Sequence, residues 1–205
     1  MLEGKNVNLR IMEKEDLPFY VNWVNDPSFF GEYNPLEQTT KAEMEKNYDT
    51  APPERKRFFI EKKNGTNIGV IGVWSAGALW EIGFTLIPSE RGKGYGTEAV
   101  TIMVDYLFLS RDLVRIQATT DLKNKASQAL LEKIGFKREG TLRKSYFMRG
   151  VWTDCYIYSI LREEWKEPKI LTKTLRNRDK TLPQPTIRTS ERHILDRRKH
   201  GRVIA

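Results

Sequence analysis

The sequence has few of the residues on which many enzyme mechanisms depend. Its 205 residues include one cysteine, Cys155, and two histidines, His193 and His200, which both lie near the C-terminal end. A single cysteine supports neither an internal disulfide nor a cysteine-built metal site. The rest of the chain has no histidine to act as a base or to bind zinc. We therefore expect an enzyme or binding protein without a metal cofactor.

Long apolar stretches are missing as well. No segment approaches the roughly 20 apolar residues of a membrane-spanning helix, and residues 1–5 lack the apolar region of a signal peptide. Hydrophobic residues make up 39% of the chain and charged residues 30%, as in soluble globular proteins. This composition predicts a cytoplasmic protein that makes no membrane contact.

Charge is distributed unevenly along the chain. There are 35 basic and 27 acidic residues, and 12 of the basic but only 4 of the acidic ones fall within residues 166–205. We predict a domain over residues 1–165, whose charges balance, and a basic C-terminal extension over residues 166–205. The extension has few large apolar residues, so an extended or partly helical appendage is expected. It is either a solvated tail or a contact for RNA, a ribosome or an acidic partner.

Periodicity and turn residues predict an α+β fold. Strands are indicated by β-branched and aromatic runs, and helices by apolar residues at helical spacing. The expected order is a strand (7–11), a helix from residue 13, a loop (28–37), a helix (40–48), three strands (58–62, 67–74, 80–87), a helix (99–109), a strand (113–120), a helix (125–134) and a strand hairpin (136–146, 151–161).

A glycine-rich joint connects the strand over residues 80–87 to the helix that follows it. It reads Arg91-Gly92-Lys93-Gly94-Tyr95-Gly96-Thr97. Such a joint turns backbone N–H groups and a helix N-terminus towards one point, which favours an anion. Glycine allows the backbone to approach a ligand closely, and Arg91 and Lys93 add positive charge. We predict a pyrophosphate site here.

Several interpretations of this joint compete. A nucleotide-binding P-loop needs a serine or threonine after its lysine, but Lys93 is followed by Gly94. A dinucleotide-binding fold accepts Gly94-x-Gly96-x-x-Ala99 but needs alternating strand–helix units and an acidic residue about 20 positions further on. Asp121, 27 positions beyond Gly94, fits that spacing poorly. A purely structural turn is a further alternative.

Three ordered motifs carry a resemblance to a known family. Residues 91–96 resemble the acyl-CoA signature of the GNAT superfamily of N-acyltransferases. The next helix of that superfamily has two counterparts in this sequence. Its start resembles Asn124-Lys125-Ala126-Ser127, and its end with the glycine–phenylalanine pair that follows resembles residues 131–136. The resemblance covers about residues 1–165 and is closest to the Rim-type branch, which acetylates the N-termini of ribosomal proteins.

The resemblance implies a mixed, mostly antiparallel central sheet with a splayed parallel strand pair, flanked by about four helices. It implies acetyl-CoA as co-substrate and a primary amine as acceptor. Phe84, Thr85 and Leu86 would offer main-chain groups to pantetheine. Asn124 and Ser127 would lie near the thiol arm. The pyrophosphate would meet the seven residues Arg91, Gly92, Lys93, Gly94, Tyr95, Gly96 and Thr97.

The implied catalytic groups are less complete. Ser127 would protonate the thiolate, and Glu32 and Tyr33 would contact the acceptor. Asn124 has an equally good explanation as a plain helix cap. Many GNAT enzymes have a tyrosine acid at the position of Leu131, and the Rim-type branch has a glutamate base at the position of Tyr146.

This chain has Tyr146 at that position, and we expect Tyr146 to contact the substrate. Glu81 is then the remaining candidate base, and a purely structural role for this glutamate is an equally good interpretation. A site without a strong base suits an α-amine, which costs about 1–1.4 kcal/mol to deprotonate at pH 7 against about 4.6 kcal/mol for a lysine amine. We therefore expect an N-acetyltransferase for a peptide or protein N-terminus, such as that of a ribosomal protein. An acetyltransferase for an antibiotic or polyamine, or a non-catalytic CoA-binding regulatory module, are the alternatives. The oligomeric state is open.

Overall fold

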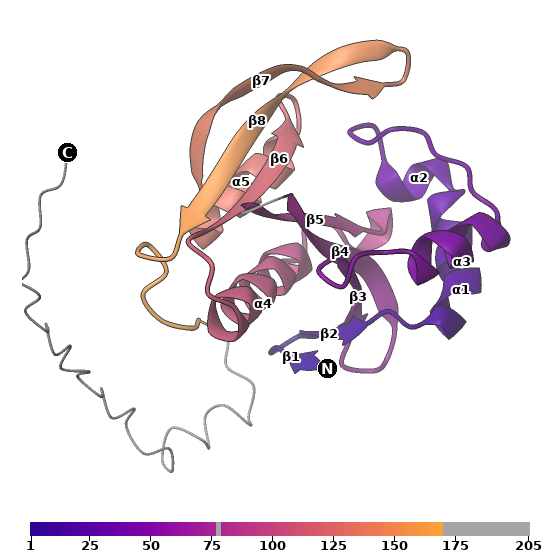
Figure 1. The fold of residues 1–205 in the computed structure, drawn as a ribbon, viewed down its shortest axis with the longest axis horizontal. Helices are drawn as coiled ribbons and strands as arrows, with labels where there is room; N and C mark the ends of the chain where they lie inside the picture. Colours follow the sequence, from indigo (N-terminus) through magenta and orange to yellow (C-terminus); the bar gives the residue numbers. More distant parts are fainter. Residues whose placement is uncertain (77–78, 170–205) are drawn as a thin grey trace, which may run out of the picture.

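The computed structural model describes residues 1–76 and 79–169 (Figure 1). Its strands form one sheet with the order β1-β2-β3-β4-β5-β6-β8-β7. The strands are β1 (Leu2–Glu3), β2 (Val7–Ile11), β3 (Lys56–Lys62), β4 (Asn67–Ala76), β5 (Leu79–Leu86), β6 (Arg115–Asp121), β7 (Lys137–Met148) and β8 (Val151–Leu161). The helices are α1 (Leu17–Val24), α2 (Pro27–Phe30), α3 (Lys41–Asp49), α4 (Tyr95–Ser110) and α5 (Lys125–Ile134).

The sheet is antiparallel except between β5 and β6, which run parallel and are connected through α4. These two strands pair only at Trp80 with Ile116 and at Glu81 with Gln117. Beyond these pairs β5 and β6 have no further register partners in each other. The predicted mixed sheet with a splayed parallel pair is thereby confirmed, and its opening leaves the edge of β5 from Ile82 onward without a neighbouring strand.

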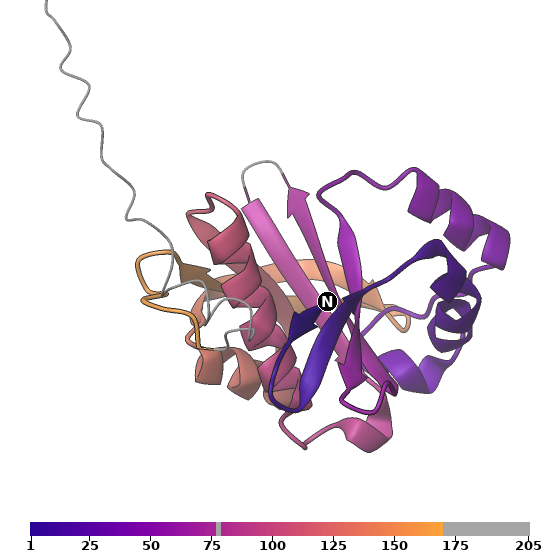
Figure 2. The same ribbon diagram turned by 90° about the horizontal axis from the view of Figure 1, so that it is seen from below.

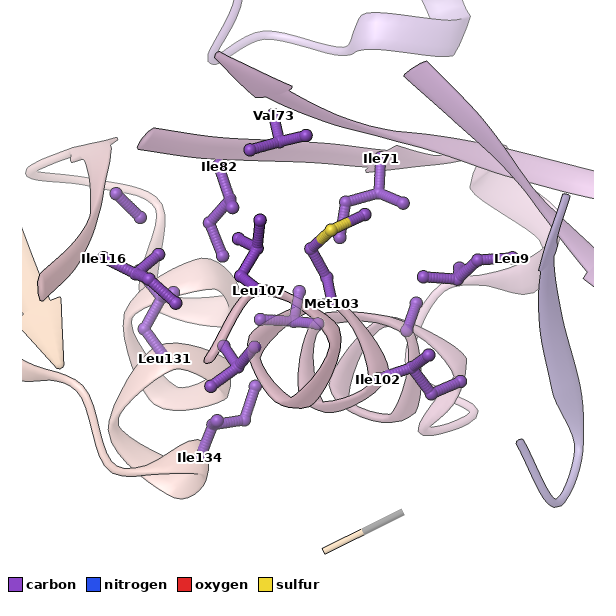
Figure 3. Packing of buried hydrophobic residues seen from close by; sticks show 14 of the residues in the cluster. Leu9, Ile71, Val73, Ile82, Ile102, Met103, Leu107, Ile116, Leu131 and Ile134 are labelled. Carbon is purple, nitrogen blue, oxygen red and sulfur yellow. The ribbon is translucent and has the colours of Figure 1, made fainter. Parts of the chain in front are cut away.

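One face of the sheet packs against α4 and α5. Ile71, Val73 and Ile82 point from β4 and β5 towards Met103 and Leu107 of α4 (Figure 3). All five side chains are at most 2% exposed. Strand side chains alternate between faces, so every second residue of these strands contributes to this core. It contains 25 buried residues and is the larger of the two apolar clusters among the described residues.

The opposite face of the sheet is covered by α1, α2 and α3, so that the sheet lies between two helical layers (Figure 2). A smaller cluster forms here around Phe59, which is fully buried and packs against α1. Thr40 caps α3 as predicted: its hydroxyl accepts the Glu43 N–H at 3.2 Å, and the Glu43 carboxylate accepts the Thr40 N–H at 2.8 Å.

The structure differs from the sequence prediction in a few places. Residues 27–30 form α2, where a loop was expected, because Pro27 opens the helix and the Asp26 side chain accepts the Ser28 N–H at 2.9 Å. Strand β1 was not predicted. β7 is longer than expected and its register shifts between Leu142 and Tyr146, where Lys144 has a φ of 50°.

The beginning of the predicted basic extension returns to the domain. Asp105 of α4 accepts hydrogen bonds from Trp165 Nε1 at 2.8 Å and from the Lys169 N–H at 3.0 Å. The remainder of that extension, residues 170–205, lies outside the described residues. Over residues 1–76 and 79–169, none of the helices combines the length and the apolar character needed to cross a membrane.

Candidate functional site

The glycine-rich joint is built as an open backbone cradle. Gly92 and Gly94 have φ values of 73° and 86°, and a Cβ at either position would meet nothing within 4 Å. Gly94 is the N-cap of α4 and no side chain caps this helix. The first N–H groups of the helix have no acceptor within the helix itself. The joint therefore presents free donors and the positive end of α4 to the same open space.

Gly96, the third glycine of the joint, has a packing role. A Cβ on Gly96 would come within 3.0 Å of Leu130 Cδ1 and 3.5 Å of Leu86 Cδ1. Gly96 itself is buried in the first turn of α4. Its lack of a side chain lets α4 approach β5 and α5, so this residue is explained by packing.

The two basic side chains of the joint are occupied within the protein. Arg91 Nε donates to the Leu86 carbonyl at 2.9 Å, and Arg91 Nη2 donates to the Phe29 carbonyl at 2.6 Å. Lys93 Nζ lies 3.2 Å from Glu90, whose carboxylate also pairs with Lys62 at 2.7 Å. We expected both side chains to supply charge to the anion. Instead Arg91 holds α2 against the end of β5, and the backbone N–H groups are the free donors.

A cleft opens where β5 and β6 diverge, with a volume of about 260 Å³. Five predicted site residues line it, namely Tyr33, Phe84, Thr85, Asn124 and Ser127. Leu86, Glu32, Glu81, Tyr146 and the glycine-rich joint are not among its lining residues. The structure thus brings the predicted pantetheine and thiol-arm residues together in one cleft.

Asn124 and Ser127 lie at the start of α5, on the β6 side of this cleft. The Asn124 side chain accepts the Ser127 N–H at 3.1 Å and so caps the helix. Asn124 is therefore a helix cap that also faces the cleft. Leu131, at the position where many GNAT enzymes have a tyrosine, is fully buried in the core and takes no part in proton transfer.

Glu81 is half-buried and hydrogen-bonded on both carboxylate oxygens. Thr119 Oγ1 donates to Glu81 Oε1 at 3.0 Å, and Gln117 Nε2 donates to Oε2 at 3.3 Å. The Tyr146 hydroxyl lies 3.1 Å from Thr119 Oγ1. Since the one proton of Thr119 goes to Glu81, Tyr146 donates to Thr119. Burial and the nearby Glu81 carboxylate raise the pKa of the Tyr146 phenol, which keeps it neutral at pH 7.

The predicted acceptor contacts are divided by the structure. Tyr33 is half-buried and lines the cleft, whereas Glu32 is exposed outside it. A hydrogen-bonding interaction with the Glu32 carboxylate raises the pKa of the Tyr33 phenol. Glu32 therefore reaches the cleft only through Tyr33.

Several lining residues were missed by the sequence analysis. Arg57, Trp74, Thr119 and Asp121 all face the cleft. Their positions follow from strand register, since residues directly opposite each other on paired strands share a face. Side-chain alternation alone placed each of them on a strand face. It did not show that β3, β4 and β6 present them to the same space.

Comparison with known proteins agrees with this geometry. A family model described as an acetyltransferase (GNAT) domain matches residues 6–137. The probable N-acetyltransferase YjcK of Bacillus subtilis (strain 168) is 32% identical over an alignment of 184 positions, and the match covers 80% of this chain and 98% of YjcK. The putative ribosomal N-acetyltransferase YdaF of the same organism is 34% identical over 89 residues, which are 43% of this chain and 49% of YdaF.

A solved structure shows the same fold. The spermidine N-acetyltransferase from Vibrio cholerae in complex with CoA and spermine has a TM-score of 0.69 and 23% identity to this chain, covering 79% of it and 99% of the other chain. The family model covers more than half of the sequence, and YjcK is similar over almost its entire length. The chain therefore belongs to the GNAT family and is an acetyl-CoA-dependent N-acetyltransferase.

Proposed function

We propose that this acetyltransferase modifies the α-amine of a peptide or protein N-terminus. The observation that carries the proposal is the position of Glu81, which does not line the cleft and is separated from it by the Thr119 hydroxyl. A base reached through a hydroxyl group suits an acceptor that loses its proton easily. An α-amine with a pKa near 7.7–8.0 costs about 1–1.4 kcal/mol to deprotonate at pH 7, whereas a lysine or polyamine amine costs about 4.6 kcal/mol.

In this proposal the proton leaves the amine through the Thr119 hydroxyl, which lines the cleft. The Thr119 oxygen accepts a proton from the amine as its own proton passes to Glu81 Oε1, so the net transfer is from amine to carboxylate and the hydroxyl group ends neutral. Tyr146, which is not among the lining residues, donates to Thr119 Oγ1 and positions that hydroxyl. The amine nitrogen forms a bond to the acetyl carbon as the carbon–sulfur bond breaks. Ser127, at the start of α5, then donates its hydroxyl proton to the thiolate as it takes a proton from solvent, so the serine ends neutral.

The remaining binding roles belong to the backbone. N–H groups from Gly92 to Thr97 would hold the pyrophosphate. The β5 edge at Phe84, Thr85 and Leu86 would bind the amide groups of pantetheine in the opening beside β6. The paired ends of β5 and β6 bring the thioester towards Thr119, so that donor and acceptor meet at the base of the opening.

A polyamine acceptor is the second candidate. It is supported by the fold shared with the spermidine N-acetyltransferase from Vibrio cholerae. The two candidates differ in the amine that reacts: an α-amine on a peptide, or a primary amine at the end of a flexible polycation.

A turnover assay with matched acceptors tests the proposal. Release of the CoA thiol would be followed with a thiol reagent for three acceptors: a lysine-free peptide with a free N-terminus, an N-terminally blocked peptide containing one lysine, and spermidine. Cys155 does not disturb this readout because it is 1% exposed and burial raises its pKa to about 11. We expect turnover with the free N-terminus only, and mass spectrometry should place the acetyl group there. Turnover confined to spermidine or to lysine would contradict the proposal.

The ribosomal contact is proposed on charge alone. The basic excess of residues 166–205 supports binding of RNA or a ribosome. Deletion of residues 170–205 should leave turnover on a short peptide unchanged and weaken RNA binding at low salt. Equal RNA binding by the full and shortened chains, or no binding by either, would exclude this role.

A further inference from the structure

A row of residues across the sheet connects the base of the cleft to an arginine. Gly83 of β5 lies opposite Gly72 of β4, and Gly72 lies opposite Arg57 of β3. Residues in direct register point to the same side of a sheet, so all three face the helical layer of α1 to α3. The two glycines contribute no side chain of their own, and the lining of the cleft runs along this row from the β5–β6 opening to Arg57.

The Trp74 ring packs over the two glycines and forms part of the cleft wall. A Cβ on Gly83 would lie 3.0 Å from Trp74 Cη2, and a Cβ on Gly72 would lie 3.7 Å from Trp74 Cζ3 and 3.9 Å from Arg57 Cγ. The tryptophan ring thus lies over the glycine pair and borders the space in front of Arg57. All four residues are lining residues of the cleft.

No carboxylate among the described residues pairs with the Arg57 guanidinium. Its carbon lies 5.7 Å from the centroid of the Tyr20 ring, and it makes no hydrogen bond or ion pair with any residue that the structure describes. Arg10, the penultimate residue of the neighbouring strand β2, shows the usual arrangement: it pairs with Asp16 at 2.8 Å and with Glu61 at 3.1 Å. A half-buried cation normally has such partners.

The charges around the cleft are arranged by sign. Arg55 and Arg57 repel each other: burial first, and the charge of Arg57 second, lower the pKa of Arg55. Asp121 faces the opposite side of the cleft, where its carboxylate accepts the Lys123 N–H at 2.7 Å. The charged residues of the cleft lining are therefore Arg57 on the β3 side and Asp121 on the β6 side, and Glu81 lies behind Thr119.

We propose that Arg57 binds a carboxylate carried by the acceptor, while the reacting amine lies at the β5–β6 opening. The inference rests on the proposed function, which makes this cleft the acceptor site. A dipolar acceptor matches the two signs of charge, and a guanidinium binds a carboxylate with two parallel hydrogen bonds. A polycation would instead meet Arg57 with like charge.

The register sets the spacing between the two groups. Neighbouring strands lie about 4.8 Å apart, so Arg57 starts roughly 10 Å from β5 across the sheet, and its long side chain covers part of that distance. In a free amino acid the carboxylate lies too close to the reacting amine to reach Arg57. An acidic side chain at the second or third position of a peptide, or the C-terminal carboxylate of a dipeptide, has the required separation.

The experiment compares acceptors that differ only in charge. Two amidated peptides carry glutamate or glutamine at the second position, and one dipeptide is used with a free or an amidated C-terminus. The enzymes are the wild type, Arg57→Gln and Arg57→Lys, with Lys56→Gln as control. Lys56 is the adjacent cation on β3 and points to the opposite face of the sheet.

We expect the wild type to prefer glutamate over glutamine by about 10–100-fold in kcat/KM, as for a charge-assisted hydrogen bond. Arg57→Gln should reduce this ratio to about 1, Arg57→Lys should retain part of it, and Lys56→Gln should keep all of it. The dipeptide pair shows whether a C-terminal carboxylate is recognised as well as an acidic side chain. Melting temperatures and CoA binding by calorimetry identify any variant that fails to fold, in which case the wild-type ratio and Arg57→Lys decide.

Two results would contradict the inference, and only one of them would also contradict the proposed function. If peptides are acetylated but the wild type shows no charge preference, or if Arg57→Gln keeps the preference, the inference is wrong and the proposed function stands. If spermidine is acetylated and no peptide is, both are wrong.

Discussion

The two faces of the central sheet differ in how completely apolar side chains cover them. The face towards α4 is continuous: Ile71, Val73 and Ile82 fill it and are at most 2% exposed. On the face towards α1 to α3, the same strands place Gly72 and Gly83 side by side, and the Trp74 ring lies over them in the wall of the cleft. The larger apolar cluster lies on the first face, and the second face carries the cleft that we propose as the acceptor site.

The largest expected effect lies on the packed face. Leu107→Ala removes a fully buried side chain of α4 and should lower the free energy of unfolding by about 3 kcal/mol. Because Leu107 is remote from the cleft, kcat/KM per folded molecule should be unchanged. Denaturant unfolding and peptide turnover measure the two quantities. Leu109→Ala, at a side chain that is 48% exposed, is the control and should change neither quantity. A loss of turnover in fully folded Leu107→Ala would show that the packed face also contributes to activity.

A substitution on the sheet face that carries the cleft should lower activity more than stability. Gly83→Val adds a β-branched side chain whose Cβ alone would lie 3.0 Å from Trp74 Cη2, so the indole ring must move within the cleft beside the β5–β6 opening. Strand geometry tolerates valine, so we expect a modest change in stability and a loss in kcat/KM of about 100-fold or more, comparable to a strong loss of substrate positioning. Thermal unfolding and turnover separate the two. A variant that unfolds but keeps its activity per folded molecule would show that Gly83 is a packing residue.

A smaller loss is expected along the proton path. Thr119→Val removes the hydroxyl group between Tyr146 and Glu81, and Glu81→Gln removes the final acceptor. Each should lower kcat by about tenfold, below the 10²–10⁴-fold typical of a directly acting general base. The rising limb of the pH–rate profile should still follow the pKa of the acceptor amine. A loss above 10²-fold in Glu81→Gln, with folding and CoA binding intact, would identify Glu81 as a strong direct base.

The smallest effect concerns an ion pair that supports the helical layer on the sheet face that carries the cleft. A hydrogen bond from Arg10 lowers the pKa of Asp16 in the folded protein. Its contribution is therefore fully present above the unfolded pKa of about 3.9 and is lost as the pH falls through the lower folded value. Asp16→Asn should cost about 1 kcal/mol at pH 7, and the difference from wild type should shrink below about pH 4. Urea unfolding at both pH values measures this, with the more exposed Asp49 of the Lys14 pair as a control position.

The same contrast explains what the sequence alone predicted. The packed face was predictable, because alternation on strands such as β4 and helical spacing in α4 each show a buried side from local pattern. The glycine-rich joint was predictable because its spacing is local too. The cleft residues Arg57, Trp74 and Thr119 were missed because their meeting depends on the register of four strands. The helix α2 was missed because a four-residue helix has no periodic pattern.

The proposed function depends on the glycine-rich joint before α4, whose open backbone we propose as the binding site of acetyl-CoA. Gly94 and Gly65 offer a matched pair: their φ values are 86° and 85°, and a Cβ at either would meet nothing within 4 Å. Valine at either position therefore carries the same backbone strain without a clash. Isothermal calorimetry with CoA should show at least a tenfold loss of affinity in Gly94→Val and none in Gly65→Val, with similar losses of stability. Equal CoA affinity in the two variants would show that the glycine-rich joint does not bind the cofactor.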